Sequence, residues 1–373
     1  MIYLDAGATT LQKPRQVQQA VGQAVSTLSS PGRGSYQATR LAEQTDYRCR
    51  EAAARLFGVE DPARVVFTSN ATHGLNIAIR SLVKPGGRAV ITGYEHNAVT
   101  RPLHSIPEVE LVILDAPLFA PEELLRQCRA ALEEKADAVI VNHVSNVFGS
   151  IAPVGDIAAL CREKGVPLVV DASQSAGVLP ISLADWGAAF VAMPGHKGLY
   201  GPQGTGLLLC GGEAKPLLYG GTGTQSLLQT MPREYPDLLE AGTHNMPGIA
   251  GLLEGLRFVE SRGVEAIRRH ETALVKEALA ALRAIPGIVC FYDASGQSQS
   301  GVLSFIAEGY DSEELAEALA RRGIALRAGL HCAPLAHRTA GTLKTGTVRL
   351  SPSVFNTPRE IRLFAEALRG VLR

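Results

Sequence analysis

Short apolar runs alternate with amphipathic segments from about residue 50 to residue 210. Seven runs have strand length: RVVFTS (64–69), RAVITG (88–93), LVILD (111–115), DAVIVNH (137–143), PLVVDAS (167–173), AAFVAM (188–193) and GLLLC (206–210). Uninterrupted apolar runs are typical of strands covered on both faces of a mostly parallel sheet. Stretches such as 121–135 and 156–165 carry apolar residues at helical spacing, which predicts crossover helices. The pattern therefore predicts an α/β fold with a doubly wound, mostly parallel seven-stranded sheet and flanking helices.

The pattern changes after Gly221. A Gly- and Thr-rich stretch, GGTGTQS, leads into one long helical segment from about residue 249 to 284. A smaller α+β unit follows, with strands predicted in GIVCFYD, GVLSFIA, GIALRAG and TVRLSP and amphipathic helices in 311–323 and 357–372. Because 373 residues exceed what one core usually holds, two domains are expected. We predict a large domain over 15–247 and a small domain made of 1–14 and 248–373.

The overall charge is balanced, with 36 Lys and Arg against 36 Asp and Glu. The chain therefore has no net field that would attract nucleic acid or an anionic membrane surface. The first residues, MIYLDAGATT, lack the regions of a signal peptide, and no apolar run approaches the roughly 20 residues that span a bilayer. We expect a cytoplasmic protein that binds neither nucleic acid nor a membrane.

The six cysteines are scattered without a CxxC pair: Cys49, Cys128, Cys161, Cys210, Cys290 and Cys332. This spacing argues against both a zinc site and a disulfide framework, so no metal site is predicted. Five of them stand in helical patterns or apolar runs, where a small buried hydrophobe fits. Cys332 is different, because it lies in GLHCAP, where Gly329 and Pro334 predict a loop.

Polar residues follow several of the apolar runs, and ligands of open α/β sheets bind at the carboxyl ends of the strands. Thr72 in SNATHG would open a helix whose N–H groups suit a phosphate, although such residues also simply cap helices. The other candidates are His96 in YEHNAV, Asn146 in HVSNVFG, Asp171 and Gln174 in VDASQSAG, and Lys197 in MPGHKG. Each of them alone has an ordinary structural interpretation, as a cap, a turn residue or a solvated lysine.

Asp171 and Lys197 together carry more information than either does alone. Asp171 follows four apolar residues, and burying its charge without a cationic partner would be costly. Lys197 ends the next strand in a glycine-flanked loop, where burial and positive neighbours can expose a nucleophilic amine. A protonated pyridine nitrogen beside Asp171 and a Schiff base on Lys197 would place both residues on one cofactor.

The motifs, taken in order, resemble those of the class V aminotransferase group. They are YLDAGATT, SNATHGLN, EHNAV, HVSNVFG, VDASQSAG, GHKGLYGPQGTG, EAGTHN, RAGLHCAP and VRLSPSVFN. Within that group the chain is similar to the cysteine desulfurases, nearer the selenocysteine-lyase-like branch (group II), over essentially its whole length. The resemblance implies a homodimeric enzyme of fold type I that depends on pyridoxal 5′-phosphate.

The resemblance also implies a role for each matching residue. Lys197 would form the Schiff base and move protons, and His96 would stack on the pyridine ring and assist acid–base steps. Asp171 would pair with the pyridine nitrogen, and Gln174 would reach the phenolic oxygen. The phosphate would be bound by Thr72, by His196 and, from the neighbouring subunit, by Thr243, and His73 is also predicted to bind the cofactor.

The implied reaction removes sulfur from L-cysteine and leaves L-alanine. Arg349 would clamp the substrate carboxylate bidentately, with Asn146 and Arg327 nearby. Cys332 would accept the sulfur as a persulfide and pass it to an acceptor protein or a small thiol. Only the thiolate is an effective nucleophile, so a positive neighbour, His331 or Arg327, would favour its deprotonation.

Three positions depart from the family pattern. Gly7 replaces an Asn of the first motif, Tyr36 replaces a His, and Pro194 replaces a Ser or Thr whose hydroxyl donates to the phosphate. Other activities remain open at this point: a lyase acting on selenocysteine, cystine or cysteine sulfinate, and a catalytically silent scaffold of the same fold. A phosphate-binding module is disfavoured, because neither GGTGTQS nor GPQGTG matches a P-loop or a GxGxxG after the first strand.

Overall fold

The seven predicted strands form one sheet in the computed structural model, which describes residues 1–32 and 34–372. The strands are β2 (Val65–Thr68), β3 (Arg88–Thr92), β4 (Glu110–Leu114), β5 (Ala138–Asn142), β6 (Leu168–Asp171), β7 (Phe190–Pro194) and β8 (Gly206–Cys210), in the order β2-β8-β7-β6-β5-β3-β4. Only β8 runs antiparallel to its neighbours in this sheet, and the other pairs are parallel. The predicted fold class is confirmed.

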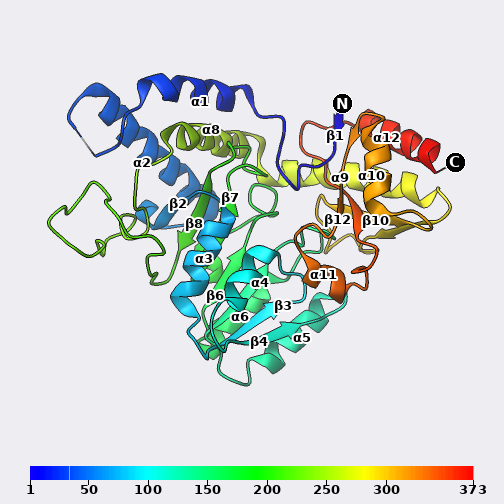
Figure 1. Ribbon diagram of the computed structural model, residues 1–373, viewed down its shortest axis with the longest axis horizontal. Helices are drawn as coiled ribbons and strands as arrows, with labels where there is room; N and C mark the ends of the chain where they lie inside the picture. The colour runs from blue at the N-terminus through cyan, green and yellow to red at the C-terminus, as the bar shows by residue number, and fades with distance from the viewer. Residues whose placement is uncertain (33, 373) are drawn as a thin grey trace.

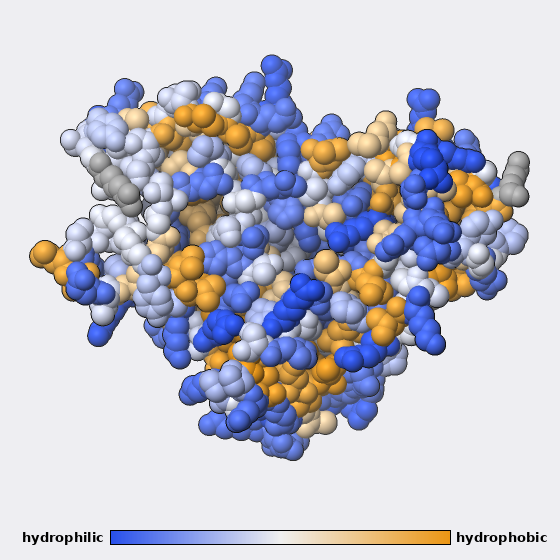
Figure 2. All heavy atoms as spheres, in the orientation of Figure 1, coloured by the Kyte–Doolittle hydropathy of each residue, from blue (hydrophilic) through white to orange (hydrophobic). Residues whose placement is uncertain are grey.

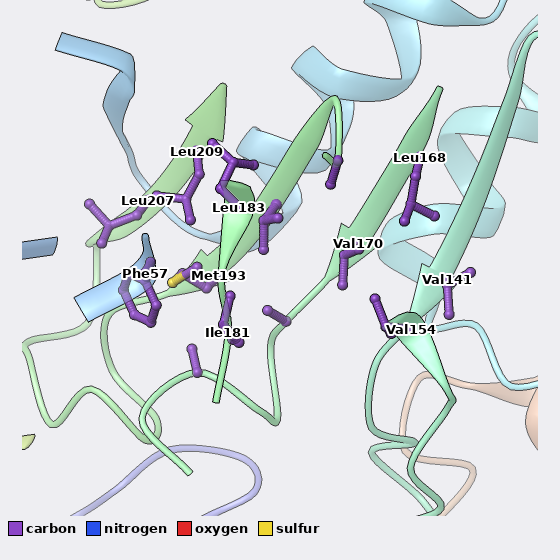
Figure 3. Close-up of a cluster of buried hydrophobic side chains, with 14 of the residues drawn as sticks. Phe57, Val141, Val154, Leu168, Val170, Ile181, Leu183, Met193, Leu207 and Leu209 are labelled. Atoms are coloured by element: carbon purple, nitrogen blue, oxygen red, sulfur yellow. The ribbon is translucent and has the colours of Figure 1, made fainter. Parts of the chain in front are cut away.

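Both faces of this sheet are buried, which explains why its strands are continuously apolar. Val139 and Val141 of β5 belong to one core cluster, whereas Ala138 and Ile140 belong to the cluster on the opposite face. Figure 3 shows the first cluster, with Val141 and its neighbours from β6, β7 and β8 pointing to the same side of the sheet. Alternate residues of the central strands therefore supply two separate cores, whereas the edge strand β4 is partly open to water, with Ile113 37% exposed.

Helices cover the two faces of the sheet (Figure 1). Side chains of α3 (Ala71–Leu82) and α4 (Asn97–His104) pack on one face. The other face is covered by α2 (Gln37–Phe57), α5 (Pro121–Ala131), α6 (Val154–Lys164) and α7 (Leu183–Trp186), and α1 (Arg15–Thr27) lies outside them against α8. A short 3₁₀ turn, η1 (Pro62–Arg64), leads into β2.

The C-terminal part builds a second, smaller core beside the large sheet. Its antiparallel sheet has the order β12-β13-β10-β9, with β9 (Ile288–Phe291), β10 (Leu303–Ala307), β12 (Arg327–Gly329) and β13 (Thr347–Leu350). The helices α10 (Ser312–Ala320) and α12 (Pro358–Val371) pack on it, and α11 (Pro334–Thr339) follows the Cys332 loop. The N-terminal β1 (Ile2–Tyr3) pairs with β11 (Ile324–Ala325), so the chain starts next to this small unit (Figure 1).

Three details differ from the sequence predictions. The single helical segment predicted for 249–284 is two helices, α8 (Met246–Arg262) and α9 (Val264–Arg283), because Gly263 between them has φ +79°, which interrupts a helix. The single strand predicted in GIALRAG is split into β11 and β12, which belong to different sheets. Cys290 is only partly buried, whereas it was expected in the core.

The two helices that replace the long segment also serve different cores. Residues of α8 pack in the core under the large sheet, and residues of α9 pack in the small core. The division into 15–247 and the remainder of the chain stays a prediction. Within residues 1–32 and 34–372, none of the helices combines the length and apolar character needed to cross a bilayer.

Candidate active site

A cavity of about 220 Å³ lies at the carboxyl ends of the parallel strands, where the small unit meets the large sheet. Nine of the predicted site residues line it: Thr72, His96, Asn146, Asp171, Gln174, His196, Lys197, Arg327 and Arg349. These residues come from five separate segments at the large sheet's edge and from two strands of the small sheet. Strand topology therefore brings together side chains that are up to 277 positions apart (from Thr72 to Arg349).

Lys197 lies in the loop after β7 and faces the cavity. The pKa of Lys197 is lowered to about 8, chiefly by burial among protein atoms and also by the positive charge of Arg349, while Asp171 opposes the shift. The loop is tethered at its backbone, where the Thr10 hydroxyl donates to the carbonyls of His196 and Lys197 at 3.0 and 3.3 Å. At this pKa roughly a tenth of the amine is neutral and nucleophilic at pH 7, far more than for an ordinary exposed lysine.

Asp171 and His96 approach Lys197 from two other strand ends: Asp171 from β6, which is next to β7, and His96 from the turn after β3. Asp171 ends β6, is only 2% exposed, and accepts a hydrogen bond from the backbone N–H of Ser173 at 2.9 Å. His96 caps α4, with its Nδ1 accepting from the backbone N–H of Ala98 at 3.0 Å. Burial lowers the pKa of His96 to about 4. The ring is therefore neutral, and since Nδ1 accepts, its proton sits on Nε2.

The other end of the cavity is suited to an anion. The first turn of α3 begins at Ala71 and places Thr72 in the cavity wall, where unpaired N–H groups and the helix dipole favour negative charge. His196 faces the same space, and its Nδ1 lies 3.0 Å from the Thr9 hydroxyl. Burial, with help from Lys197, lowers the pKa of His196 to about 4, so this imidazole is a neutral hydrogen-bonding group.

Arg349 forms the wall contributed by the small sheet and is 1% exposed. One of its Nη atoms contacts Asp5 at 2.6 Å, and the other donates to the backbone carbonyl of Asn146 at 2.9 Å. Its Nε and the Oδ1 of Asn146 are buried without a hydrogen-bond partner among the described residues. Asp5 holds the guanidinium in place and was not identified from the sequence, because the two residues are 344 positions apart.

Cys332 lies beside the cavity rather than in its lining and is exposed, whereas the other five cysteines are buried or partly buried. The Nη2 of Arg327 is 3.8 Å from its sulfur, so a cation that lines the cavity also contacts the thiol. The loop is held by two backbone contacts: the N–H of Asn97 donates to the Cys332 carbonyl, and Asn146 donates to the His331 carbonyl, at 2.8 and 2.9 Å.

His331 was expected to supply positive charge to this thiol, and the structure contradicts that. It is 3% exposed, and burial together with Arg349 brings its pKa far below the ordinary value. Its ring stacks on His337 with centroids 5.7 Å apart. A neutral, enclosed imidazole does not stabilise a thiolate by charge, which leaves Arg327 as the cation next to Cys332.

Two residues predicted to bind the cofactor lie outside the cavity. His73 and Thr243 line a separate pocket of about 550 Å³, which also contains Thr72 and His244. Asn70 and Thr72 line both spaces, so the two pockets meet at the start of α3. The role of Thr243 in a neighbouring subunit therefore stays a prediction, and His73 does not line the cavity of its own chain.

Sequence patterns also gave no indication of Glu95, which precedes His96. It is fully buried, and burial raises its pKa to about 8 although Thr92 and the backbone of Asn142 oppose the shift. Its Oε1 accepts from the Thr92 hydroxyl at 2.6 Å and from the Asn142 N–H at 2.8 Å. Glu95 thus fixes the turn that presents His96, and only its position at a strand end could have pointed to it.

Comparison with known proteins places this arrangement in a family. The family model described as Aminotransferase class-V matches residues 2–364. The chain belongs to the class-V aminotransferase family. A relative from Methanothermobacter thermautotrophicus, named probable cysteine desulfurase, is 31% identical over 382 residues, which cover 99% of this chain and 94% of the relative.

A second relative, from Mycolicibacterium paratuberculosis and also named probable cysteine desulfurase, is 34% identical over 388 residues; they cover all of this chain but 55% of that longer protein. Solved structures agree. A cysteine desulfurase from Thermococcus onnurineus has a TM-score of 0.92 at 30% identity, covering 99% of this chain and 94% of that one. The Escherichia coli cysteine desulfurase CsdA has a TM-score of 0.87 at 26% identity, with 99% and 94% covered.

Class-V aminotransferases depend on pyridoxal 5′-phosphate, and the cavity of this family member fits that group chemically. An amine of lowered pKa, a buried carboxylate and a neutral imidazole face one space, and a helix N-terminus lies at one end. The buried Asp171 carboxylate has no ion-pair partner among the described residues. A cationic ring nitrogen would supply one.

The three departures from the family pattern lie in different places in this class-V aminotransferase. Pro194 lines the cavity, where its ring offers no donor. Gly7 also lines it, and a Cβ at that position would lie 3.2 Å from the guanidinium carbon of Arg349. Tyr36 lies far from this wall: it is 54% exposed, caps α2, and bonds to Ser29 through its hydroxyl at 2.7 Å.

Proposed function

We propose that the chain is a cysteine desulfurase that removes sulfur from L-cysteine, releases L-alanine and keeps the sulfur on Cys332 as a persulfide. The observation that carries this proposal is the position of Cys332. It is the exposed thiol of the chain, and it sits 3.8 Å from Arg327, a cation in the wall of the cavity that holds Lys197. Transfer of sulfur from substrate to enzyme requires a thiol close to the cavity that holds the Lys197 amine, and Cys332 has that position.

Arg349 and Asn146 would bind the carboxylate of the amino acid. Asp5 and the Asn146 carbonyl take up two of the five N–H groups of Arg349, and the other three remain for a ligand. Because the guanidinium is already fixed by these contacts, little side-chain entropy is lost when the substrate binds. The Gly7 backbone comes close to this guanidinium, and a larger residue there would crowd the substrate carboxylate.

The predicted cofactor residues would hold pyridoxal 5′-phosphate, which supplies an electron sink for bond breaking next to the amino group. Lys197 would bind it covalently and then take and return the substrate's α proton through Nζ. Asp171 would keep the ring nitrogen protonated, and Gln174 and the neutral His96 would donate hydrogen bonds from their own N–H groups. Thr72, His196, the α3 N-terminus and the partner's Thr243 would bind the phosphate, and His73 would support that end from the adjoining pocket.

In the sulfur-transfer step, the Cys332 thiolate would attack the substrate sulfur. The new S–S bond forms as the substrate C–S bond breaks, and the electron pair stays with the carbon fragment. A proton returned to that carbon completes alanine, so atoms and charge balance without an external oxidant. Arg327 would favour the thiolate through its positive charge.

Replacing Cys332 with alanine tests the sulfur-transfer step. We expect sulfide release from L-cysteine in the absence of added thiol to fall at least about 100-fold, because the attacking nucleophile is gone. Mass spectrometry of the wild type after exposure to cysteine should find one extra sulfur on the peptide that contains Cys332. Cys290→Ala, a partly buried thiol elsewhere in the fold, is the matched control and should retain activity. Undiminished sulfide release by Cys332→Ala would refute the persulfide mechanism.

Pro194 gives a second test, aimed at the cofactor. We expect Pro194→Ser to bind pyridoxal 5′-phosphate at least about tenfold more tightly, because a hydrogen bond to a charged group contributes roughly 1.5–3 kcal/mol. Pro194→Ala, which removes the ring without adding a hydroxyl, is the control. Fluorescence titration of the apoprotein with the cofactor measures both affinities. Equal affinities for the two variants would show that a hydroxyl at position 194 does not contribute to cofactor binding.

We further propose that the active unit is a cytoplasmic homodimer. A projecting segment around residues 217–231 exposes several apolar side chains, Leu218, Tyr219, Leu227 and Leu228, with Leu227 97% exposed. It forms the projection at the left of Figure 1, and Figure 2 shows hydrophobic surface at the tip of the same projection. Such exposed apolar groups are typical of surfaces covered in an assembly. Thr243 lies just after this segment, in the neighbouring pocket.

A further inference from the structure

A second, much smaller space lies directly behind Lys197. This chamber has a volume of about 30 Å³ and shares part of its wall with the active-site cavity, since Gly7, Gln174 and Lys197 line both. The rest of its wall comes from the small unit and from the segment after Lys197, and includes Tyr200, Glu271 and Ser300. Such a volume accommodates about one or two water molecules, provided that polar groups are present to bind them.

Glu271 is the charged group of this chamber that the proposed reaction does not use. It lies in the second turn of α9, is 7% exposed, and sits so close to Gly301 that a Cβ there would lie 2.8 Å from its Oε2. Burial alone raises the pKa of Glu271 to about 8, with no hydrogen bond or charge among the described residues opposing it. Its carboxyl group is therefore protonated at neutral pH.

The other two buried glutamates of the described residues each have a charged or hydrogen-bonding partner for at least one carboxylate oxygen, which sets Glu271 apart. Glu240 forms an ion pair with Arg50 at 2.7 Å, and Glu95 accepts hydrogen bonds from Thr92 and from a backbone N–H. A carboxyl group retained in the interior without such partners needs another ligand, because an unsatisfied buried polar group costs free energy.

Two hydroxyl groups of the chamber are in the same situation. Ser300 Oγ and Tyr200 Oη are buried without a partner of normal hydrogen-bond geometry among residues 1–32 and 34–372. The Tyr200 ring is completely buried, and burial together with the nearby Glu271 raises the pKa of its phenol. Both hydroxyls therefore carry their protons. A water molecule between them and Glu271 would satisfy all three groups.

We propose that the chamber holds ordered water and that Glu271 acts through this water as a positioning residue that stores a proton for Lys197. In the forward direction the O–H bond of Glu271 breaks as water takes its proton, and the water gives another proton to Nζ of Lys197. A neutral acid and a neutral amine thus become a carboxylate and an ammonium, and the reverse transfer restores them. Lys197 and Tyr200 are the other titratable groups that line the chamber.

This inference rests on the proposed acid–base role of Lys197 and adds a proton source on the side away from the substrate. The pKa of Lys197 is lowered to about 8, close to that of Glu271, so a proton can move between them with little difference in free energy. The location matters as well. Glu271 comes from α9 and Lys197 from the loop after β7, so the path between them joins the small unit to the large sheet.

Infrared spectroscopy of the purified holoenzyme tests the proposal without using the reaction. At pH 6.5 an un-ionised carboxyl group gives a carbonyl band that shifts in D₂O, and we expect Glu271→Gln to lose one such band while the band of Glu95 remains. Glu265→Gln, on the same helix but 55% exposed, is the control and should leave the spectrum unchanged. A spectrum of Glu271→Gln identical to that of the wild type overturns the proposal.

A second measurement tests the connection to Lys197. In Lys197→Ala, the pH at which the Glu271 band disappears should rise, because the amine that takes the Glu271 proton through the water is gone. An unchanged midpoint would show that Glu271 is only structural. Sulfide release by the wild type is assayed separately. Sulfide release with an unchanged midpoint would refute only the role of Glu271. A shifted midpoint without sulfide release would refute only the desulfurase activity.

Discussion

Replacing Lys197 with alanine is expected to lower the rate of sulfide release from L-cysteine by about 10³-fold, since positioned proton transfer alone contributes roughly 10²–10⁴-fold. The variant loses both functions proposed for Lys197, which are covalent attachment of the cofactor and proton transfer. Lys197 faces the cavity with an amine of lowered pKa, and no second lysine lines that cavity in the described part of the chain. Lys13, the nearest alternative, directs its amine to the Thr10 hydroxyl and to the carbonyl of His196.

The attachment of the cofactor gives a readout separate from the rate. After borohydride reduction, mass spectrometry should find the mass of the cofactor on the peptide containing Lys197 in the wild type and on no peptide of Lys197→Ala. Lys215→Ala, an exposed lysine in the loop after β8, is the matched control and should behave like the wild type. Cofactor trapped on another lysine, or full activity of Lys197→Ala, would contradict the assignment.

Much of the fold could be predicted from the sequence because strands covered on both faces leave a strong local signal. Each of the seven runs is apolar at consecutive positions, and the structure uses odd and even positions for two cores. The break between α8 and α9 was missed because Gly263 lies in a pattern that stays amphipathic on both sides. Its positive φ depends on the two helices packing into different cores, which no local pattern reveals.

The candidate site was partly predictable for a similar reason. His96, Asp171 and Lys197 each follow a strand, and strand ends of a parallel sheet meet at one edge. Charge and burial were not predictable. Asp5 pairs with Arg349 across almost the whole chain, and His331 is neutral because the small unit encloses it. Such properties depend on long-range packing, whereas motifs report only which residue types are adjacent in sequence.

A buried ion network near the second pocket gives the largest stability effect that we expect. The guanidinium of Arg50, 4% exposed, contacts both oxygens of Glu240 at 2.7 Å and also contacts Asp46 at 2.8 Å. Glu240 further accepts from the backbone N–H of Phe67 at 2.6 Å, so it ties α2 to the first strand of the sheet. Removing one partner would leave a buried charge without compensation.

His244 joins this network, with its ring nitrogens 3.2 Å from Asp46 and 3.1 Å from Glu240. The hydrogen bond to Asp46 raises the pKa of His244 above its ordinary value, against the effect of burial. A raised folded-state pKa means that the stabilisation is fully present below the unfolded-state pKa, roughly 6.5, and is lost as pH rises through the folded-state pKa. The free energy of unfolding should therefore decrease over that interval above pH 6.5.

Glu240→Ala is expected to lower the free energy of unfolding by about 3–5 kcal/mol, the usual cost of leaving one member of a buried ion pair alone. Urea denaturation followed by circular dichroism measures the loss. Glu213→Ala is the matched control, because that carboxylate contacts Arg64 at 3.5 Å with 87% exposure, and it should change stability by less than about 1 kcal/mol. The pH dependence above 6.5 should also weaken in Glu240→Ala, since His244 keeps only Asp46. A loss no larger than that of the control would mean that the Arg50 network contributes little to the fold.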